Sequence, residues 1–160
     1  MSSKKRVLII CYYWPPAGGS GVQRHLKFAK YLRDFGWEPI IYTVKNGEYP
    51  ETDYTLLSEI PEGIEIIRRP IREPYTFYKL FTGQKKNEKL SPNFFSQKKV
   101  GWMQKFSIFL RSNFFIPDAR MWWIKPSVKF LKKYLAENPV DVMISSGPPH
   151  SLHLIANSIK

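Results

Sequence analysis

The chain has few of the residues that mark several common classes of protein. It contains a single cysteine, Cys11, so it can form no internal disulfide, which fits a reducing compartment. Acidic residues are also scarce, since 13 Asp and Glu oppose 25 Lys and Arg and leave a net charge of +12. This balance indicates a surface that meets anions, and nucleic acid, nucleotide phosphates and anionic lipid headgroups all qualify.

Long hydrophobic runs are missing as well. No apolar stretch approaches the roughly 20 residues that span a bilayer. The basic residues 1–6 precede an apolar run at residues 7–13, but this run is too short for a signal peptide and lacks a small-residue cleavage site. The sequence therefore predicts a cytoplasmic protein and leaves open a peripheral position on the inner face of the membrane.

Motifs of several common enzyme classes are absent too. The chain has no Walker loop, no G-x-S-x-G elbow and no CxxC pair. Its three histidines, His25, His150 and His153, have no spacing to Cys or acidic residues that suits a metal, so neither a metal nor a cofactor is predicted. With 160 residues, of which 43% are hydrophobic and 16% aromatic, the chain is expected to form one folded domain.

The most informative stretch is residues 6–35. Its apolar run at 7–13 is typical of a strand buried on both faces, because a half-exposed strand would alternate apolar and polar residues. A Pro- and Gly-rich turn at 14–21 follows, and then a helix with one buried face is predicted from the spacing of Val22, Leu26, Ala29, Leu32 and Phe35. The loop lies where backbone N–H groups and the positive end of the helix can receive an anion. A tight turn with no ligand explains the glycines equally well.

Three further strands are predicted, at residues 38–44, 64–68 and 140–146. Helices are expected at 54–60 and 75–81, from Pro126 onward and after His150, and the first helix should end at Gly36. This alternation predicts an α/β fold with a Rossmann-like open, mostly parallel sheet and helices on both faces. The second strand ends without a carboxylate to hold a ribose, and the loop does not read G-x-G-x-x-G, so NAD binding is disfavoured.

Residues 98–135 combine positive charge with aromatic rings, because nine Lys and Arg there oppose one acid, Asp118. Such a composition suits a segment at a membrane interface. A pair of helices that pack aromatic rings on a sheet explains it too, and the two interpretations are compatible. No RNA- or DNA-binding motif is present, so nucleic acid is not predicted as a partner. The candidate membrane-facing side chains are Lys98, Lys99, Trp102, Lys105, Phe106 and Arg111.

The turn at residues 147–151 follows the fourth strand as the glycine loop follows the first. Parallel strands carry functional loops at their C-terminal ends, at a topological switch point. If the first and fourth strands are neighbours, Gly18, Gly19, Gly21 and His150 should face one crevice. The positive end of the helix dipole would favour a neutral, hydrogen-bonding His150, and a simple capping role for this residue stays open.

Several of these segments together resemble a known family. Residues 7–16, 18–24 and 31–39 are similar to the opening of a family 4 glycosyltransferase of GT-B fold. Residues 117–120, Pro-Asp-Ala-Arg, and 144–151 also resemble the N-terminal domain of such enzymes, particularly bacterial ones that build surface polysaccharide.

The resemblance implies the acceptor-binding half of a retaining glycosyltransferase that needs no metal, takes a UDP- or GDP-sugar donor, and uses a saccharide or lipid-linked acceptor. Residues 1–160 would be a single Rossmann-like domain that stops before its last strand, without the C-terminal donor-binding domain, and would be inactive alone. His150 would act near the reacting centre. A non-catalytic module on an anionic membrane surface is the alternative function. The residues expected to contact donor or acceptor are Gly18, Gly19, Ser20, Gly21, Arg24, Asp118 and Arg120.

Overall fold

The structure is a computed structural model that describes residues 4–71 and 116–160. The helix expected at 75–81 and all six candidate membrane-facing side chains lie outside the described residues. Four strands form one parallel sheet in the order β3-β2-β1-β4, which confirms the Rossmann-like open α/β fold. The strands are β1 (Lys5–Cys11), β2 (Trp37–Val44), β3 (Glu65–Arg69) and β4 (Val142–Ser146).

Strand β1 lies at the centre of the fold, between β2 and β4. Its residues 7–11 are at most 1% exposed, as the continuous apolar run predicts. Because successive side chains alternate between the two faces, Leu8 and Ile10 belong to one hydrophobic cluster, and Val7, Ile9 and Cys11 belong to another. The sheet therefore divides the core into two layers.

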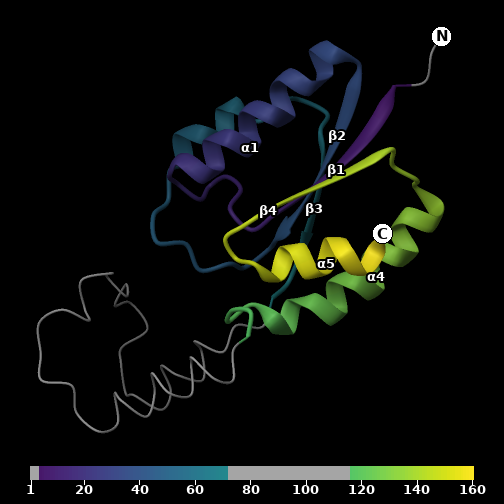
Figure 1. The fold of residues 1–160 in the computed structure, drawn as a ribbon. Helices are drawn as coiled ribbons and strands as arrows, with labels where there is room; N and C mark the ends of the chain where they lie inside the picture. The colour runs from purple at the N-terminus through teal and green to yellow at the C-terminus, as the bar shows by residue number, and fades with distance from the viewer. Residues whose placement is uncertain (1–3, 72–115) are drawn as a thin grey trace, which may run out of the picture.

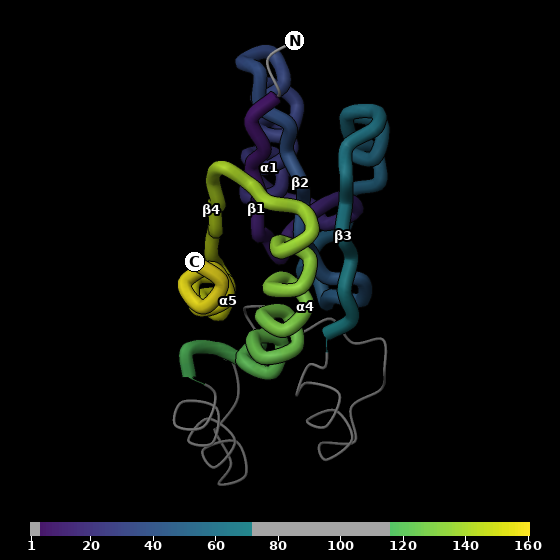
Figure 2. Tube along the Cα trace, turned by 90° about the vertical axis from the view of Figure 1, so that its right-hand side faces the viewer, coloured from purple at the N-terminus to yellow at the C-terminus, as the bar shows by residue number. Residues whose placement is uncertain are grey.

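Helices cover both layers. Helix α1 (Ser20–Tyr31) lies on one face with the short 3-10 helix η2 (Tyr54–Glu59), and α4 (Ile124–Glu137) and α5 (Ser151–Ile159) lie together on the other (Figures 1 and 2). A 3-10 turn, η1 (Leu32–Phe35), extends α1, and Gly36 ends it in the left-handed conformation with φ of 78°, as predicted.

Helix α4 begins earlier than the sequence predicts. It starts at Ile124, directly after the 3-10 turn η4 (Met121–Trp123), so that Pro126 is its third residue and not its first. The N–H groups of a first helical turn have no partner within the helix, so a proline is tolerated there. The helical segment therefore extends back through the two tryptophans.

Cys11 should be unreactive in the folded protein. The thiol is fully buried, and burial raises its pKa to about 12 from an ordinary value of 9.0. The thiolate is the reactive form, so alkylation by iodoacetamide at pH 8 should be about a thousandfold slower in the folded chain than in urea. Mass spectrometry of timed samples measures both rates, and similar rates would contradict the prediction.

The buried thiol also makes stability depend on pH. Since the unfolded chain releases the Cys11 proton at a lower pH than the folded chain does, the free energy of unfolding should fall as the pH rises from 9 toward 12.

Candidate functional site

Strands β1 and β4 form the topological switch point of the sheet. They are adjacent and parallel, with Cys11 paired to Ser146, and their helices α1 and α5 leave toward opposite faces. Ligands of open α/β sheets bind beside the carboxyl ends of two such strands. The neighbouring strands required by the sequence prediction are thus present, and the glycine loop and the 147–151 turn both begin here. We call the region between these two segments, outside the ends of β1 and β4, the crevice.

The glycine loop is held in place by a strand-like contact with residues 51–53. Gly18 N–H donates to the Glu51 carbonyl over 3.0 Å, and Asp53 N–H donates to the Pro16 carbonyl over 2.8 Å. A Cβ on Gly18 would come within 3.0 Å of the Glu51 side chain, so the close approach favours glycine there. The loop therefore enters α1 through a fixed path.

The N-terminus of α1 faces solvent and receives no side-chain cap. Gly19, at the N-cap position with φ of 94°, supplies no side-chain cap, and the first turn holds no acidic residue. Gly19, Ser20 and Gly21 are exposed, and a Cβ on Gly19 or Gly21 would meet nothing within 4 Å. A helix N-terminus with orphan N–H groups attracts negative charge. This end of α1 can therefore receive a phosphate-like group.

The N-terminus of α5, in contrast, already holds a carboxylate. Asp118 accepts hydrogen bonds from the Ser151 N–H over 2.7 Å and from the Ser151 hydroxyl over 2.8 Å. The expected ligand residue Arg120 lies over the ring of Tyr12, at 5.0 Å from the centroid. These contacts give Asp118 and Arg120 structural partners within the chain, and their contact with a ligand stays a prediction.

Arg24 connects the two sides of the crevice. Its exposed side chain lies on the second turn of α1, and the guanidinium donates to the Ser146 hydroxyl at the end of β4 over 2.5 Å. The remaining guanidinium N–H groups keep a positive charge beside the N-terminus of α1. Among the described residues, Arg24 therefore places a positive charge where it adds to the helix dipole.

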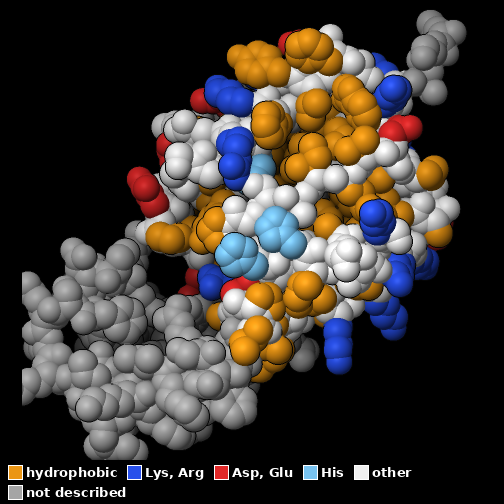
Figure 3. Space-filling model, viewed as in Figure 1, with side chains coloured by type: hydrophobic (Ala, Val, Ile, Leu, Met, Phe, Trp, Pro, Cys, Tyr) orange, Lys and Arg blue, Asp and Glu red, His pale blue; other side chains and the backbone are white. Residues whose placement is uncertain are grey.

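His150 lies on the opposite side of the crevice. It occupies the N-cap position of α5 but makes no side-chain capping bond, so the simple capping interpretation is not what the structure describes. His150 and His153 are both exposed, their ring centroids are 6.0 Å apart, and histidine side chains lie together on the face seen in Figure 3. His153 Nδ1 is 2.9 Å from Ser145 Oγ. His150 therefore presents a hydrogen-bonding ring to solvent.

Sequence reasoning missed Ser145 and Ser146. These hydroxyls hydrogen-bond to His153 and Arg24, and the sequence marks them only by their position at the end of a predicted strand, within the segment 144–151 that resembles the family. His25 is buried at 4% exposure on the inner side of α1. Burial lowers the pKa of His25, and the adjacent Arg24 acts in the same direction, so a neutral ring is favoured.

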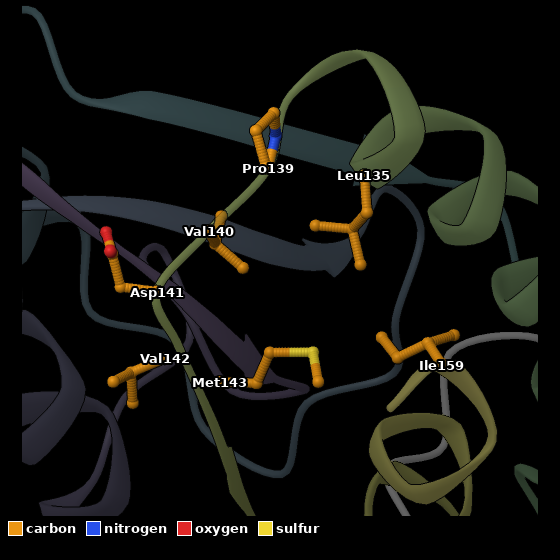
Figure 4. Close-up of a pocket in the computed structure, with 7 residues that line it drawn as sticks. All are labelled: Leu135, Pro139, Val140, Asp141, Val142, Met143 and Ile159. Carbon is orange, nitrogen blue, oxygen red and sulfur yellow. The ribbon is translucent and has the colours of Figure 1, made fainter.

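A shallow apolar pocket of about 250 Å³ lies at the other end of β4, away from the crevice. Figure 4 shows Leu135, Met143 and Ile159 pointing into a common space, and the Asp141 carboxylate accepts a hydrogen bond from Arg6 N–H over 2.7 Å. Apart from Asp141, the side chains that line this pocket are apolar. Its lining residues are Leu135, Pro139, Val140, Asp141, Val142, Met143 and Ile159.

Within residues 4–71 and 116–160, no three His, Cys, Asp or Glu side chains come together in a way that could hold a metal ion. In the same parts of the chain, no helix has the length and apolar character needed to cross a membrane. Comparison of the chain with protein-family models, with curated proteins and with solved structures finds no match.

Proposed function

We propose that this chain is the N-terminal, acceptor-binding domain of a glycosyltransferase. The enzyme would move a sugar from a nucleotide-sugar donor to a saccharide or lipid-linked acceptor in bacterial surface polysaccharide synthesis. The observation that supports the proposal is the crevice between β1 and β4. There the uncapped N-terminus of α1, the Arg24 guanidinium and the exposed His150 surround one switch point. The similarity of these segments to the family 4 pattern adds to it.

Each of the three groups has a role that suits sugar transfer. When the glycosidic bond of the donor breaks, negative charge develops on the departing diphosphate. The N–H groups at the start of α1 and the Arg24 guanidinium would stabilise that charge. Because Ser146 already orients Arg24, little reorganisation is needed when the diphosphate arrives. His150 would hydrogen-bond a hydroxyl of the donor sugar from the other side of the crevice.

An NMR titration of the chain tests this proposal. UDP, GDP and their glucose or mannose conjugates are added to ¹⁵N-labelled protein, and the amide signals are followed. We expect millimolar binding that shifts the signals of Gly19, Ser20 and Gly21. One of the two nucleotides, UDP or GDP, should bind more tightly than the other. The His150→Ala variant should keep the response to free UDP or GDP and lose the extra response to the sugar. Shifts confined to the end of β2, or no shift at 10 mM ligand, would overturn the proposal.

A Gly21→Ala variant separates ligand binding from folding. Gly21 is a helical residue with open space around it, so alanine should leave stability unchanged or raise it by up to about 1 kcal/mol. The new methyl would stand where the diphosphate approaches, and we expect the nucleotide to bind about tenfold more weakly. Urea unfolding and the titration above measure the two effects. Unchanged nucleotide binding would argue against a phosphate at this helix end.

Charge at the crevice can be tested in the same way. Arg24→Gln should weaken nucleotide binding by about 1–3 kcal/mol, because it removes a charged donor beside the diphosphate. Lys30→Gln is the matched control, because Lys30 is exposed in the last turn of the same helix. Equal losses in the two variants would show that net charge, and not the crevice, attracts the nucleotide.

A further inference from the structure

The outward face of η4 and α4 forms a continuous basic stripe. Its exposed side chains at 122, 125, 129 and 132 recur every three or four residues, and Lys133 adjoins them, so they lie on one side of the helical segment. The opposite side, with Trp123, Ser127 and Leu131, is buried against the sheet. We call the exposed stripe the lysine face, and its members are Trp122, Lys125, Lys129, Lys132 and Lys133.

The charge of the lysine face is not neutralised within the described residues. The ion pairs there involve Lys4, Arg6, Lys27 and Arg33, and none includes a lysine of this face. Glu137, at the end of α4, is the single acid of that helix. Figure 3 shows Lys and Arg side chains along the edge where Figure 1 places α4. Four lysines therefore project from one helix toward solvent.

Two exposed apolar side chains lie at or before the N-terminal end of this face in the sequence. Trp122 is 46% exposed, and Ile116, a few residues earlier, is 67% exposed. An exposed aliphatic side chain and an exposed tryptophan that precede regularly spaced lysines along the chain match the chemistry of a membrane interface. The aromatic ring lies at headgroup depth there, and the lysines meet lipid phosphates. Nucleic acid would use the lysines but gives Ile116 no counterpart.

We propose that the lysine face binds the surface of an anionic lipid bilayer, with α4 lying along it and Trp122 entering the headgroup layer. The proposal is independent of the glycosyltransferase function, because it uses none of the groups at the crevice. The two proposals fit together in space. Trp123 packs edge-on against Tyr12, just beyond the end of β1, so the start of α4 and the crevice lie at the same end of the sheet. A bound bilayer would bring that end near lipid-linked molecules.

Vesicle co-sedimentation of the full chain tests this face. Vesicles of phosphatidylglycerol with phosphatidylcholine are compared with phosphatidylcholine alone, at 50 and 500 mM salt. Near an anionic surface each lysine strengthens binding about fivefold, so Lys125→Gln with Lys129→Gln and Lys132→Gln should weaken it roughly a hundredfold. The matched control is Lys4→Gln with Lys5→Gln and Lys30→Gln, which removes the same charge from positions outside the lysine face. We expect less than a fivefold loss for the control.

Three results would overturn the proposal. Equal losses in the two triple variants would mean that net charge alone attracts vesicles. Vesicle binding that does not change with phosphatidylglycerol content would show that lipid charge does not drive it. If the triple variant of the lysine face loses more affinity for a single-stranded RNA oligonucleotide than for vesicles, the face would be assigned to nucleic acid instead. Trp122→Ser serves as a second variant, and it should weaken vesicle binding several-fold at 500 mM salt, where lysine contacts are screened. Circular dichroism verifies that each variant is folded.

Discussion

Replacing Trp123 with alanine is expected to destabilise the protein by about 3–5 kcal/mol, the usual loss for a large buried aromatic side chain. Trp123 is 1% exposed and joins η4 to the sheet. Its ring stacks on Tyr42 with centroids 5.4 Å apart and meets Tyr12 edge-on at 6.4 Å. Alanine would leave a cavity beside these two rings, in the hydrophobic cluster that also contains Leu152 and Ile155 of α5.

Urea denaturation followed by circular dichroism measures this loss, and the neighbouring tryptophan provides the control. Trp122→Ala should cost less than about 1 kcal/mol, because Trp122 is 46% exposed. Trp123→Phe should keep most of the stability. The buried Trp123 Nε1 makes no hydrogen bond among the described residues, so the packing of the ring is what stabilises the fold. Equal losses for Trp122→Ala and Trp123→Ala would contradict this account.

The tryptophan pair also shows where sequence reasoning reaches its limit. The apolar run of β1 and the spacing of Val22, Leu26 and Ala29 are strong local patterns, and a strand and a helix formed there. Phe35, which was also predicted on the buried face, is 78% exposed, because the chain changes to the 3-10 turn η1 after Tyr31. Residues 122 and 123 are both tryptophan, and they differ only in their angle around the helical axis. That angle depends on the start of the helical segment, which lies five residues before Pro126. A local pattern could not predict which ring is buried.

The candidate site, too, could be predicted only in part from the sequence. Gly19, Ser20 and Gly21 could be assigned to a helix N-terminus from sequence, since strand, loop and helix are contiguous. The neighbouring position of β1 and β4 could only be stated as a condition, because strand order depends on pairing between segments more than 100 residues apart. The Arg24–Ser146 hydrogen bond depends on that pairing, so no local pattern predicts it.

Asp118 is a further case in which the structure adds a role that the sequence does not indicate. The carboxylate lies 33 residues before Ser151 and yet caps α5. It also accepts a hydrogen bond from Arg120 N–H over 2.8 Å, which stabilises the turn before η4. One side chain thus joins the segment that starts α4 to the helix that carries His150.

Asp118→Ala should therefore destabilise the fold by about 2–4 kcal/mol. The substitution leaves the buried N–H and hydroxyl of Ser151 without partners and removes a negative charge from a helix N-terminus. Ser151→Ala should cost only about 1 kcal/mol, because the N–H bond to the carboxylate remains. Asp118→Asn, which keeps one acceptor oxygen, should fall between the two.

Urea unfolding of the three variants, combined with the nucleotide titration, distinguishes a cap from a ligand-binding residue. If Asp118 is a cap, Asp118→Asn should bind UDP or GDP as the unmodified chain does, because the crevice at α1 is intact. If the carboxylate instead contacts the donor or acceptor, nucleotide or sugar binding would fall while the stability of Asp118→Ala stayed within about 0.5 kcal/mol of the unmodified chain. A stability loss of at least 2 kcal/mol with unchanged nucleotide binding would remove Asp118 from the predicted ligand set and keep Arg24, His150 and the α1 N-terminus in it.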